Sequence, residues 1–261
     1  MLSLSSISKN FGGLQVLQNV TLTIPERGIV GLIGPNGAGK TTVFNLITGL
    51  LTPSDGSINF LGRQLNGMVP YQITRSGIAR TFQNIRLFKE MSVLENVLVA
   101  IGQQDQYAAA KVLFPCRGFA DTEQREKEIA RELLRRLSLL DKADLSAGTL
   151  SYGAQRRLEI ARALATSPKL LLLDEPAAGM NTLERQQLME EVIKLHKSGL
   201  SILLIEHDMG FVMGICEQIL VMNFGRVIAV GTPEQIRRNP QVIEAYLGQD
   251  GDSDIAPISL Y

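Results

Sequence analysis

The stretch "GPNGAGKT" at residues 34–41 constrains the fold more than any other part of the chain. It follows an apolar run and precedes a segment of helical period that starts near Lys40. A phosphate-binding loop needs this order, because it joins a strand to the positive N-terminus of a helix. Gly34, Gly37 and Gly39 let consecutive backbone N–H groups curl around an anion. The sequence therefore predicts a P-loop core, against the simpler alternative of a glycine-rich turn before a helix.

Apolar runs elsewhere alternate with longer helical segments, which is typical of strands and crossover helices in an α/β fold. The runs predicted to form strands are 2–8, 20–24, 28–33, 170–173 and 202–205. The last three lack the alternation of a half-exposed strand, so we expect them in the centre of a sheet. The first two alternate better and lie beside turn residues, so we expect antiparallel strands at the edge.

A helical lobe interrupts this pattern. The segments "SVLENVLVA" and "TEQREKEIARELLRRLSLL" have helical spacing, and a looser stretch at 102–121 joins them. The predicted fold is thus an α/β P-loop NTPase core with an antiparallel edge sheet and an inserted helical subdomain. Its predicted parts are a nucleotide-binding core at 1–83 and 165–248, the helical subdomain at 84–164, and a tail at 249–261.

Composition excludes several kinds of partner. The 26 basic and 26 acidic side chains balance, so bulk charge does not attract nucleic acid or an anionic membrane surface. Cys116 and Cys216 fit no metal spacing and suit a reducing compartment. The first residues lack the pattern of a secretory signal, and the longest apolar runs are too short to span a bilayer. We expect a cytoplasmic protein whose membrane role, if it has one, comes through a partner.

The phosphate loop gives the first set of site residues. Lys40 is predicted to reach the β- and γ-phosphates of ATP, and the Thr41 hydroxyl to bind Mg²⁺. The residues predicted to contact the nucleotide here are Gly34, Pro35, Asn36, Gly37, Ala38, Gly39, Lys40, Thr41 and Thr42.

The run "LLLLDEP" ends an expected central strand in two carboxylates. Asp174 is predicted to hold Mg²⁺, and Glu175 to orient and deprotonate the attacking water. A strand that merely ends in solvated acidic residues is the alternative, and the phosphate loop in the same chain weighs against it. The two motifs together predict ATP hydrolysis.

The rest of the chain resembles the ATP-binding cassette ATPases over nearly its whole length. The resemblance implies that Phe11 stacks on adenine, that Gln83 meets both the metal and the water, and that His207 contacts the γ-phosphate. Alone, each fits an ordinary role, as a packed aromatic, a surface amide or a helix-capping side chain. Their order along the chain favours the family. Asn181 replaces the aspartate usual in the family's loop between two active sites.

The segment "LSYGAQRRLEIARAL" at 150–164 resembles the family's signature, usually LSGGQ. In that family the start of the signature helix caps the γ-phosphate held by a second subunit. Ser151 and Gly153 are retained, whereas Tyr152 and Ala154 depart from the pattern. Because backbone groups make much of this contact, we predict a working signature with Ser151 as the hydroxyl donor and Gly153 at a close approach.

Several phrases, including "RTFQNIRLFKEMSVLENVLVA" and "GTPEQIRRNPQVIEAYLG", are similar to the LivG type of ATPase of bacterial branched-chain amino acid importers. The resemblance implies a second ATPase subunit, two permease subunits and a periplasmic binding protein, at the cytoplasmic side of the inner membrane. Apolar residues after Gln83 are candidates for contacting a permease, or for packing the lobe: Ile85, Leu87, Phe88 and Met91. A urea or amide importer, a lipopolysaccharide exporter and a soluble cassette that remodels DNA or ribosomes are the alternatives.

Overall fold

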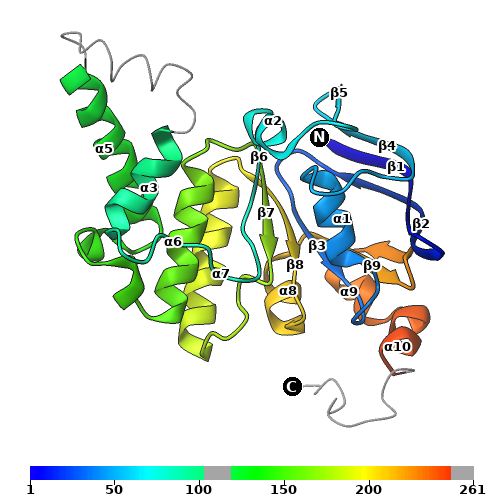
Figure 1. Ribbon diagram of the computed structural model, residues 1–261. Coiled ribbons are helices and arrows are strands. Elements are labelled where there is room, and N and C mark those ends of the chain that lie inside the picture. The colour runs from blue at the N-terminus through cyan, green and yellow to red at the C-terminus, as the bar shows by residue number, and fades with distance from the viewer. Residues whose placement is uncertain (103–118, 248–261) are drawn as a thin grey trace. The chain divides into compact units, whose positions relative to one another are not determined.

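The computed structural model of the chain describes residues 1–102 and 119–247 (Figure 1). They form two compact units. The first unit contains residues 1–68 and those from 205 onward, and the second contains Val69–Leu204.

Two predictions concern parts of the chain outside this description. The looser stretch predicted at 102–121 lies mostly at 103–118, and the predicted tail lies within 248–261. The boundaries predicted for the helical subdomain, 84–164, stay a prediction.

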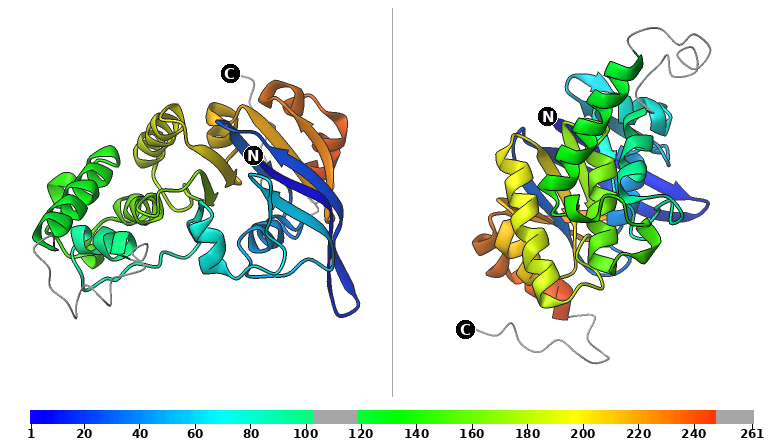
Figure 2. Two further views of the ribbon diagram at one scale, coloured as in Figure 1. Left: turned by 90° about the horizontal axis from the view of Figure 1, so that it is seen from above. Right: turned by 90° about the vertical axis from the view of Figure 1, so that its left-hand side faces the viewer.

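An antiparallel sheet opens the first unit, with strand order β2-β1-β4-β5. Its strands are β1 (Leu2–Phe11), β2 (Leu14–Ile24), β4 (Asp55–Phe60) and β5 (Arg63–Gln64). Leu2 pairs with Ile24 and Leu4 with Leu22, so the apolar residues of both strands face the core together. Figure 2 shows β1, β2 and β4 side by side, with α1 (Lys40–Ile47) beside them. The predicted antiparallel strands at 2–8 and 20–24 are confirmed.

Three further strands of the first unit are adjacent in the order β10-β9-β3. All five residues of β3 are buried, which explains why its sequence shows no alternation. It pairs in parallel with β9, and β10 pairs antiparallel with β9. The bounds are β3 (Ile29–Ile33), β9 (Gln218–Asn223), β10 (Arg226–Gly231), α8 (Met209–Ile215), α9 (Pro233–Arg237) and α10 (Pro240–Leu247).

The second unit combines strands in the order β8-β7-β6 with the helical segments. Its strands are β6 (Ile78–Arg80), β7 (Leu170–Asp174) and β8 (Ser201–Ile205). Its helices are α2 (Pro70–Arg75), α3 (Val93–Gly102), α5 (Phe119–Arg136), α6 (Tyr152–Leu164) and α7 (Thr182–Lys197), with 3₁₀ turns at Leu140–Lys142 and Ala147–Thr149. The predicted strands at 170–173 and 202–205 are confirmed, and helices α3 and α5 lie on the two segments predicted to be helical.

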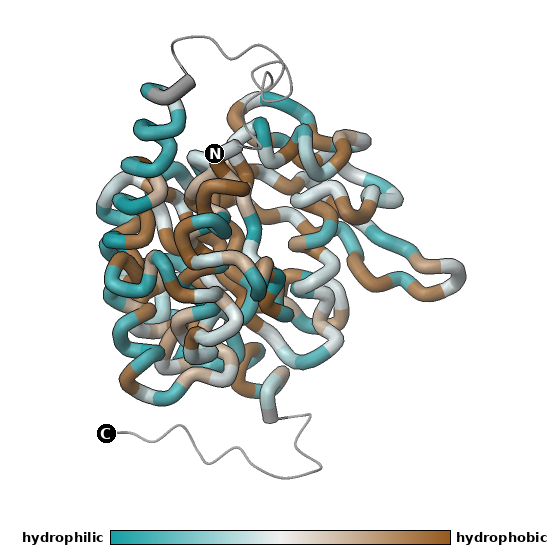
Figure 3. Tube along the Cα trace, turned by 60° about the vertical axis from the view of Figure 1, so that its left-hand side comes forward, coloured by the Kyte–Doolittle hydropathy of each residue, from teal (hydrophilic) through white to brown (hydrophobic). Residues whose placement is uncertain are grey.

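Helix α6 is the centre of the second unit, because it contacts α3, α5, α7 and β6. It therefore buries charged residues as well as apolar ones, and Arg156 is only 2% exposed. By contrast α5 contacts its neighbours along one side, and much of its course is hydrophilic (Figure 3). Among all described helices, none has the length and apolar character to cross a bilayer.

Cys216 provides a test of the packing in the first unit. It is 6% exposed, and burial, helped by the nearby Glu217 carboxylate, raises the pKa of its thiol to about 12. The thiolate is the reactive form, so alkylation at pH 8 is expected to be about a thousandfold slower in the folded chain than in urea. Mass spectrometry of the Cys216 peptide measures both rates. Equal rates would contradict this packing; Cys116 lies outside the described residues.

Candidate nucleotide site

The phosphate loop of the first unit requires its glycines for two different reasons. Gly34, Gly37 and Gly39 have φ values of 149°, 79° and 99°, which L side chains rarely adopt. A Cβ on Gly34 would lie 2.1 Å from the carbonyl oxygen of Met222, and one on Gly39 2.6 Å from Leu17 Cδ2. The loop therefore packs against β9 and β2. The backbone of β9 excludes a side chain at position 34, and the φ value of Gly39 disfavours one at position 39.

Lys40 starts α1 and is buried. Its ammonium group donates to the carbonyl oxygens of Gly34 and Pro35, at 2.6 and 2.9 Å. The two carbonyl oxygens satisfy the buried ammonium group close to where phosphate oxygens bind in such loops. The side chain is thus kept inside the loop before any anion arrives.

The other predicted residues of the loop differ in how far they are exposed to solvent. Asn36, Gly37 and Thr41 are exposed, and Thr42 is half-buried. Pro35 and Ala38 are buried, so their side chains pack inward. Ala38 offers only backbone to a ligand. Thr41 lies in the first turn of α1, where its hydroxyl reaches solvent.

Two more predicted residues belong to the first unit. Phe11 ends β1 with 45% of its surface exposed, and the Lys9 ammonium lies 5.0 Å from its ring centroid. An exposed aromatic ring is free to stack on a flat ligand. His207 is exposed, and its backbone N–H donates to the Glu206 carboxylate at 3.1 Å. Asp208, the next residue, is the N-cap of the following helix and accepts from Phe211 N–H at 3.0 Å.

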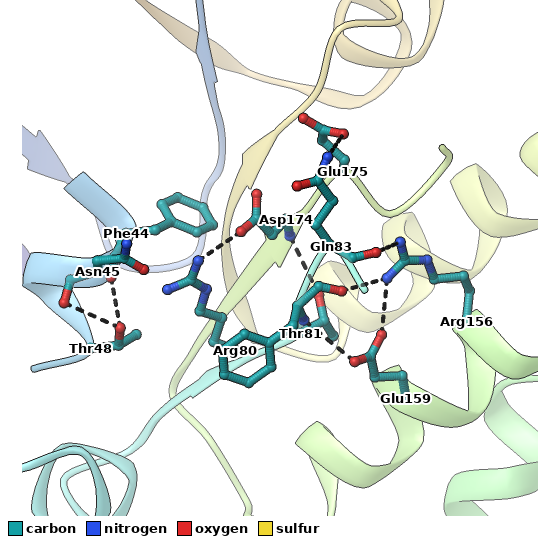
Figure 4. A network of polar contacts seen from close by, with 11 residues as sticks. Phe44, Asn45, Thr48, Arg80, Thr81, Gln83, Arg156, Glu159, Asp174 and Glu175 are labelled. Atoms are coloured by element: carbon teal, nitrogen blue, oxygen red, sulfur yellow. Dashed lines mark hydrogen bonds and ion pairs between the residues drawn. The ribbon is translucent and has the colours of Figure 1, made fainter. Parts of the chain in front are cut away.

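Asp174 ends β7 in the second unit, where 4% of it is exposed. Its carboxylate accepts from the Arg80 guanidinium at 2.7 Å, and both side chains are nearly buried (Figure 4). Because β6 runs parallel to β7, with Arg80 in register with Leu172, the arginine reaches the end of the neighbouring strand. The ion pair compensates a buried charge that would otherwise be costly.

Glu175 follows immediately and is held by Gln83, whose side-chain N–H donates to Glu175 Oε2 at 2.9 Å (Figure 4). Glu175 has a φ of 49°, which is uncommon for a residue with a side chain and is typical of functional positions. The structure thus brings together two of the three predicted catalytic residues, Glu175 and Gln83, within the second unit.

The altered signature forms an ordinary helix start. Ser151 is the N-cap of α6, and its hydroxyl accepts from Ala154 N–H at 3.4 Å. Tyr152 is the first helical residue, so replacing a glycine there strains nothing. Ala154 is fully buried. A Cβ on Gly153 would lie 2.6 Å from the Glu184 carboxylate, so the glycine leaves room for this side chain of α7.

Asn181 performs a structural task that does not need a charge. It is the N-cap of α7, and its side-chain oxygen accepts from Glu184 N–H at 2.9 Å. The Glu184 carboxylate returns a contact to Asn181 N–H at 3.3 Å, which completes a capping box. Asparagine and aspartate cap helices about equally well, so the substitution preserves this part of the loop.

Sequence reasoning missed three contacts of the site residues. Arg80 and Arg156 carry no local sequence signal that distinguishes them from solvated basic residues. Tyr246 of α10 is also largely buried, and burial raises the pKa of its phenol to about 12. A hydrogen bond with the backbone N–H of Gly34 has the opposite effect on this pKa and lowers it. That contact ties the C-terminal helix to the phosphate loop, and no local pattern predicts it.

Two family models match the chain. The one described as ABC transporter matches residues 17–178, which include the phosphate loop, the signature and Glu175. The one described as branched-chain amino acid ATP-binding cassette transporter matches residues 226–252. The chain therefore belongs to the ATP-binding cassette transporter family. It is an ATPase with the α/β cassette fold, as the motifs predict.

Similar proteins agree with this membership. The high-affinity branched-chain amino acid transport ATP-binding protein LivG of Salmonella typhimurium is 48% identical, over 95% of this chain and 98% of its own. The lipopolysaccharide export system ATP-binding protein LptB of Haemophilus influenzae is 33% identical, over 95% and 98%. A solved ATP-binding cassette of an ABC transporter, in its ADP conformation, is 33% identical with a TM-score of 0.83, over 95% of this chain and 99% of that one.

Proposed function

We propose that this chain is the ATP-hydrolysing subunit of an importer for branched-chain amino acids. The observation that carries the proposal is the 48% identity to LivG over almost the full length of both chains. The match of residues 226–252 to the branched-chain amino acid cassette model supports it independently. Lipopolysaccharide export is the weaker candidate, because identity to LptB is 33%.

The first unit would bind ATP mainly through the phosphate loop. Phe11 stacks on adenine, and Lys40 exchanges two carbonyl oxygens for phosphate oxygens. Thr41 and Asp174 would hold Mg²⁺, since a hydroxyl and a carboxylate are the oxygen ligands that this ion prefers. When bound, Mg²⁺ offsets the charge of the β- and γ-phosphates.

Hydrolysis would use the second unit's carboxylate. Glu175 accepts a proton from water while the water oxygen bonds to the γ-phosphorus, and the bond to the bridging oxygen breaks to release ADP. Gln83 orients the Glu175 carboxylate through the contact at 2.9 Å. His207, exposed two residues after β8, donates to the γ-phosphate.

The signature would contact the ATP that is held by a second ATPase subunit. Ser151 is exposed at the N-terminus of α6, where the hydroxyl and the helix dipole favour a phosphate. Gly153 has no side chain that would keep the phosphate away from this end of the helix. The assembly then has two cassettes, two permeases and a periplasmic binding protein, and this chain lies at the cytoplasmic face of the inner membrane.

Phe88 is proposed to contact a permease. It is 45% exposed, while the Arg162 guanidinium covers one side of its ring at 4.9 Å. Phe88→Glu removes apolar surface from the contact but places a carboxylate beside Arg162, so the second unit keeps its fold. We expect uptake to fall at least about tenfold, with ATP binding unchanged. Uptake assays in cells and nucleotide titration of the purified chain measure the two quantities.

Leu50→Glu is the matched control, because Leu50 is 49% exposed in the first unit. It is expected to leave uptake unchanged. Normal uptake by Phe88→Glu, or an equal loss in the control, would remove Phe88 from the permease contact.

The assembly is tested by purifying the tagged chain from membranes of its host. Glu175→Gln is included so that the ATP-bound dimer persists. Recovery of a second cassette and two permeases supports the importer. Recovery of ribosomes, DNA or no membrane protein would leave ATP hydrolysis standing and overturn the transport function.

A further inference from the structure

Arg156 lies at the centre of a buried polar network in the second unit. One of its terminal nitrogens donates to the carbonyl oxygen of Phe82 at 2.5 Å, and the other donates to that of Gln83. The second nitrogen also donates to the Tyr152 phenol oxygen at 3.2 Å. A guanidinium presents its donors in a rigid plane, so these three contacts fix its orientation together.

Glu159 completes the frame around the same backbone. Its carboxylate lies 3.1 Å from the Arg156 guanidinium and accepts from Phe82 N–H at 3.4 Å (Figure 4). The N–H and carbonyl groups of Phe82 are thus held by two side chains of α6. Gln83, the next residue, is held at two points. Its backbone carbonyl accepts from Arg156, and its side chain donates to Glu175.

Tyr152 closes the network at the signature. Its ring lies over the Arg156 guanidinium at 5.5 Å, which adds a cation–π contact to the hydrogen bond. Its other neighbour is Gly179, where a Cβ would lie 3.1 Å from the ring. Gly179 has a φ of 74° and belongs to the loop between Glu175 and α7. The Tyr152 side chain therefore contacts both the loop that follows Glu175 and the arginine that holds Gln83.

The geometry points to Tyr152 as a positioning residue for hydrolysis, which acts through Arg156 on Gln83 and so on Glu175. A glycine at 152 has neither the ring nor the hydroxyl, so this chain replaces backbone flexibility at the signature with a fixed side-chain connection. Because Ser151 is adjacent, the connection joins the surface proposed to meet a second subunit's ATP to the carboxylate that acts on the chain's own ATP. This inference rests on the proposed function.

Tyr152→Phe tests the connection with little change in packing, because the ring stays against Gly179 and only the hydroxyl is lost. In the membrane-isolated complex we expect kcat for ATP to fall about tenfold, a part of the factor of roughly 10² to 10⁴ that a positioned general base supplies. KM for ATP should not change. Tyr71→Phe is the matched control, because Tyr71 is also an exposed tyrosine that lies over an arginine four residues on, Arg75 at 5.7 Å.

A Gln83→Ala background shows whether Tyr152 acts through Gln83. If it does, Tyr152→Phe has no further effect on kcat in that background, because the side chain it positions is gone. An equal loss of kcat in both backgrounds would overturn this route. Purely structural damage would lower kcat in both.

Hydrogen exchange of the nucleotide-free full chain gives a readout that does not depend on turnover. Tyr152→Phe is expected to speed exchange at Phe82 N–H, and Tyr71→Phe is not. A wild-type value of kcat, or a wild-type rate of exchange at Phe82 N–H, in Tyr152→Phe would overturn this inference and leave the proposed function standing. A wild-type complex that hydrolyses no ATP would instead overturn the proposed function, and the inference with it.

Discussion

Glu175→Gln is expected to lower the ATP turnover number by roughly 10² to 10⁴ and to leave the dissociation constant for ATP unchanged. Glutamine has the same shape as glutamate, but its side chain cannot take a proton from water. The phosphate loop is not altered, so the groups proposed to bind the phosphates remain. Single-turnover hydrolysis and titration with a fluorescent nucleotide measure the two quantities separately.

Glu190→Gln is the control for this change, because Glu190 is an exposed glutamate on α7. It is expected to behave like the wild-type chain. Turnover by Glu175→Gln within twofold of wild type would show that another group activates the water. A large loss of ATP affinity would place Glu175 in binding instead of hydrolysis.

Arg156→Leu is expected to destabilise the second unit by about 3–5 kcal/mol at neutral pH, as removal of one partner of a buried ion pair usually does. The change leaves the Glu159 carboxylate and the carbonyl oxygens of Phe82 and Gln83 without the guanidinium. Urea denaturation measures the free energy of unfolding. The exposed Arg135, paired with Glu132, is the control, and Arg135→Leu should cost less than about 1 kcal/mol.

The loss in Arg156→Leu should shrink as pH falls. Burial raises the pKa of Glu159 in the folded chain, and the charge of Arg156 opposes that rise. Without the arginine, the pKa of Glu159 in the folded chain lies further above its value in the unfolded chain. Between these two pKa values the folded chain holds a proton on Glu159 that the unfolded chain has lost. The stability of the variant therefore falls as the pH rises through this range. The variant should therefore be closer to wild type near pH 5 than at pH 7.5.

A second substitution separates the charge from the packing. Arg156→Leu with Glu159→Leu should recover part of the lost stability, because no buried carboxylate is left unpaired. A deficit in Arg156→Leu that does not depend on pH, or no recovery in the double variant, would contradict the network.

The central strands and the phosphate loop could be predicted from sequence because their signals are local. Strands β3 and β7 are continuous apolar runs, since both faces are covered, and the loop's glycines and lysine have fixed spacing. Asp174 and Glu175 follow β7 directly, so their place at its end was also predictable. Short elements with weak patterns, such as β6 and α2, were not anticipated.

The partners of the site residues could not be predicted, because they come from strands and helices far apart in the sequence. Arg80 meets Asp174 only because β6 pairs with β7 in one register. Arg156 meets Gln83 only because α6 packs against the segment after β6. A basic run such as "QRRLE" looks solvated until the neighbours that bury it are known.

Uptake of labelled leucine tests the central claim most directly. Host cells that lack the chain receive the wild-type protein or Glu175→Gln, with equal amounts of each confirmed. We predict that wild type restores leucine uptake and that Glu175→Gln does not. Equal leucine uptake with wild type, with Glu175→Gln and with neither would contradict an ATPase that drives branched-chain amino acid import.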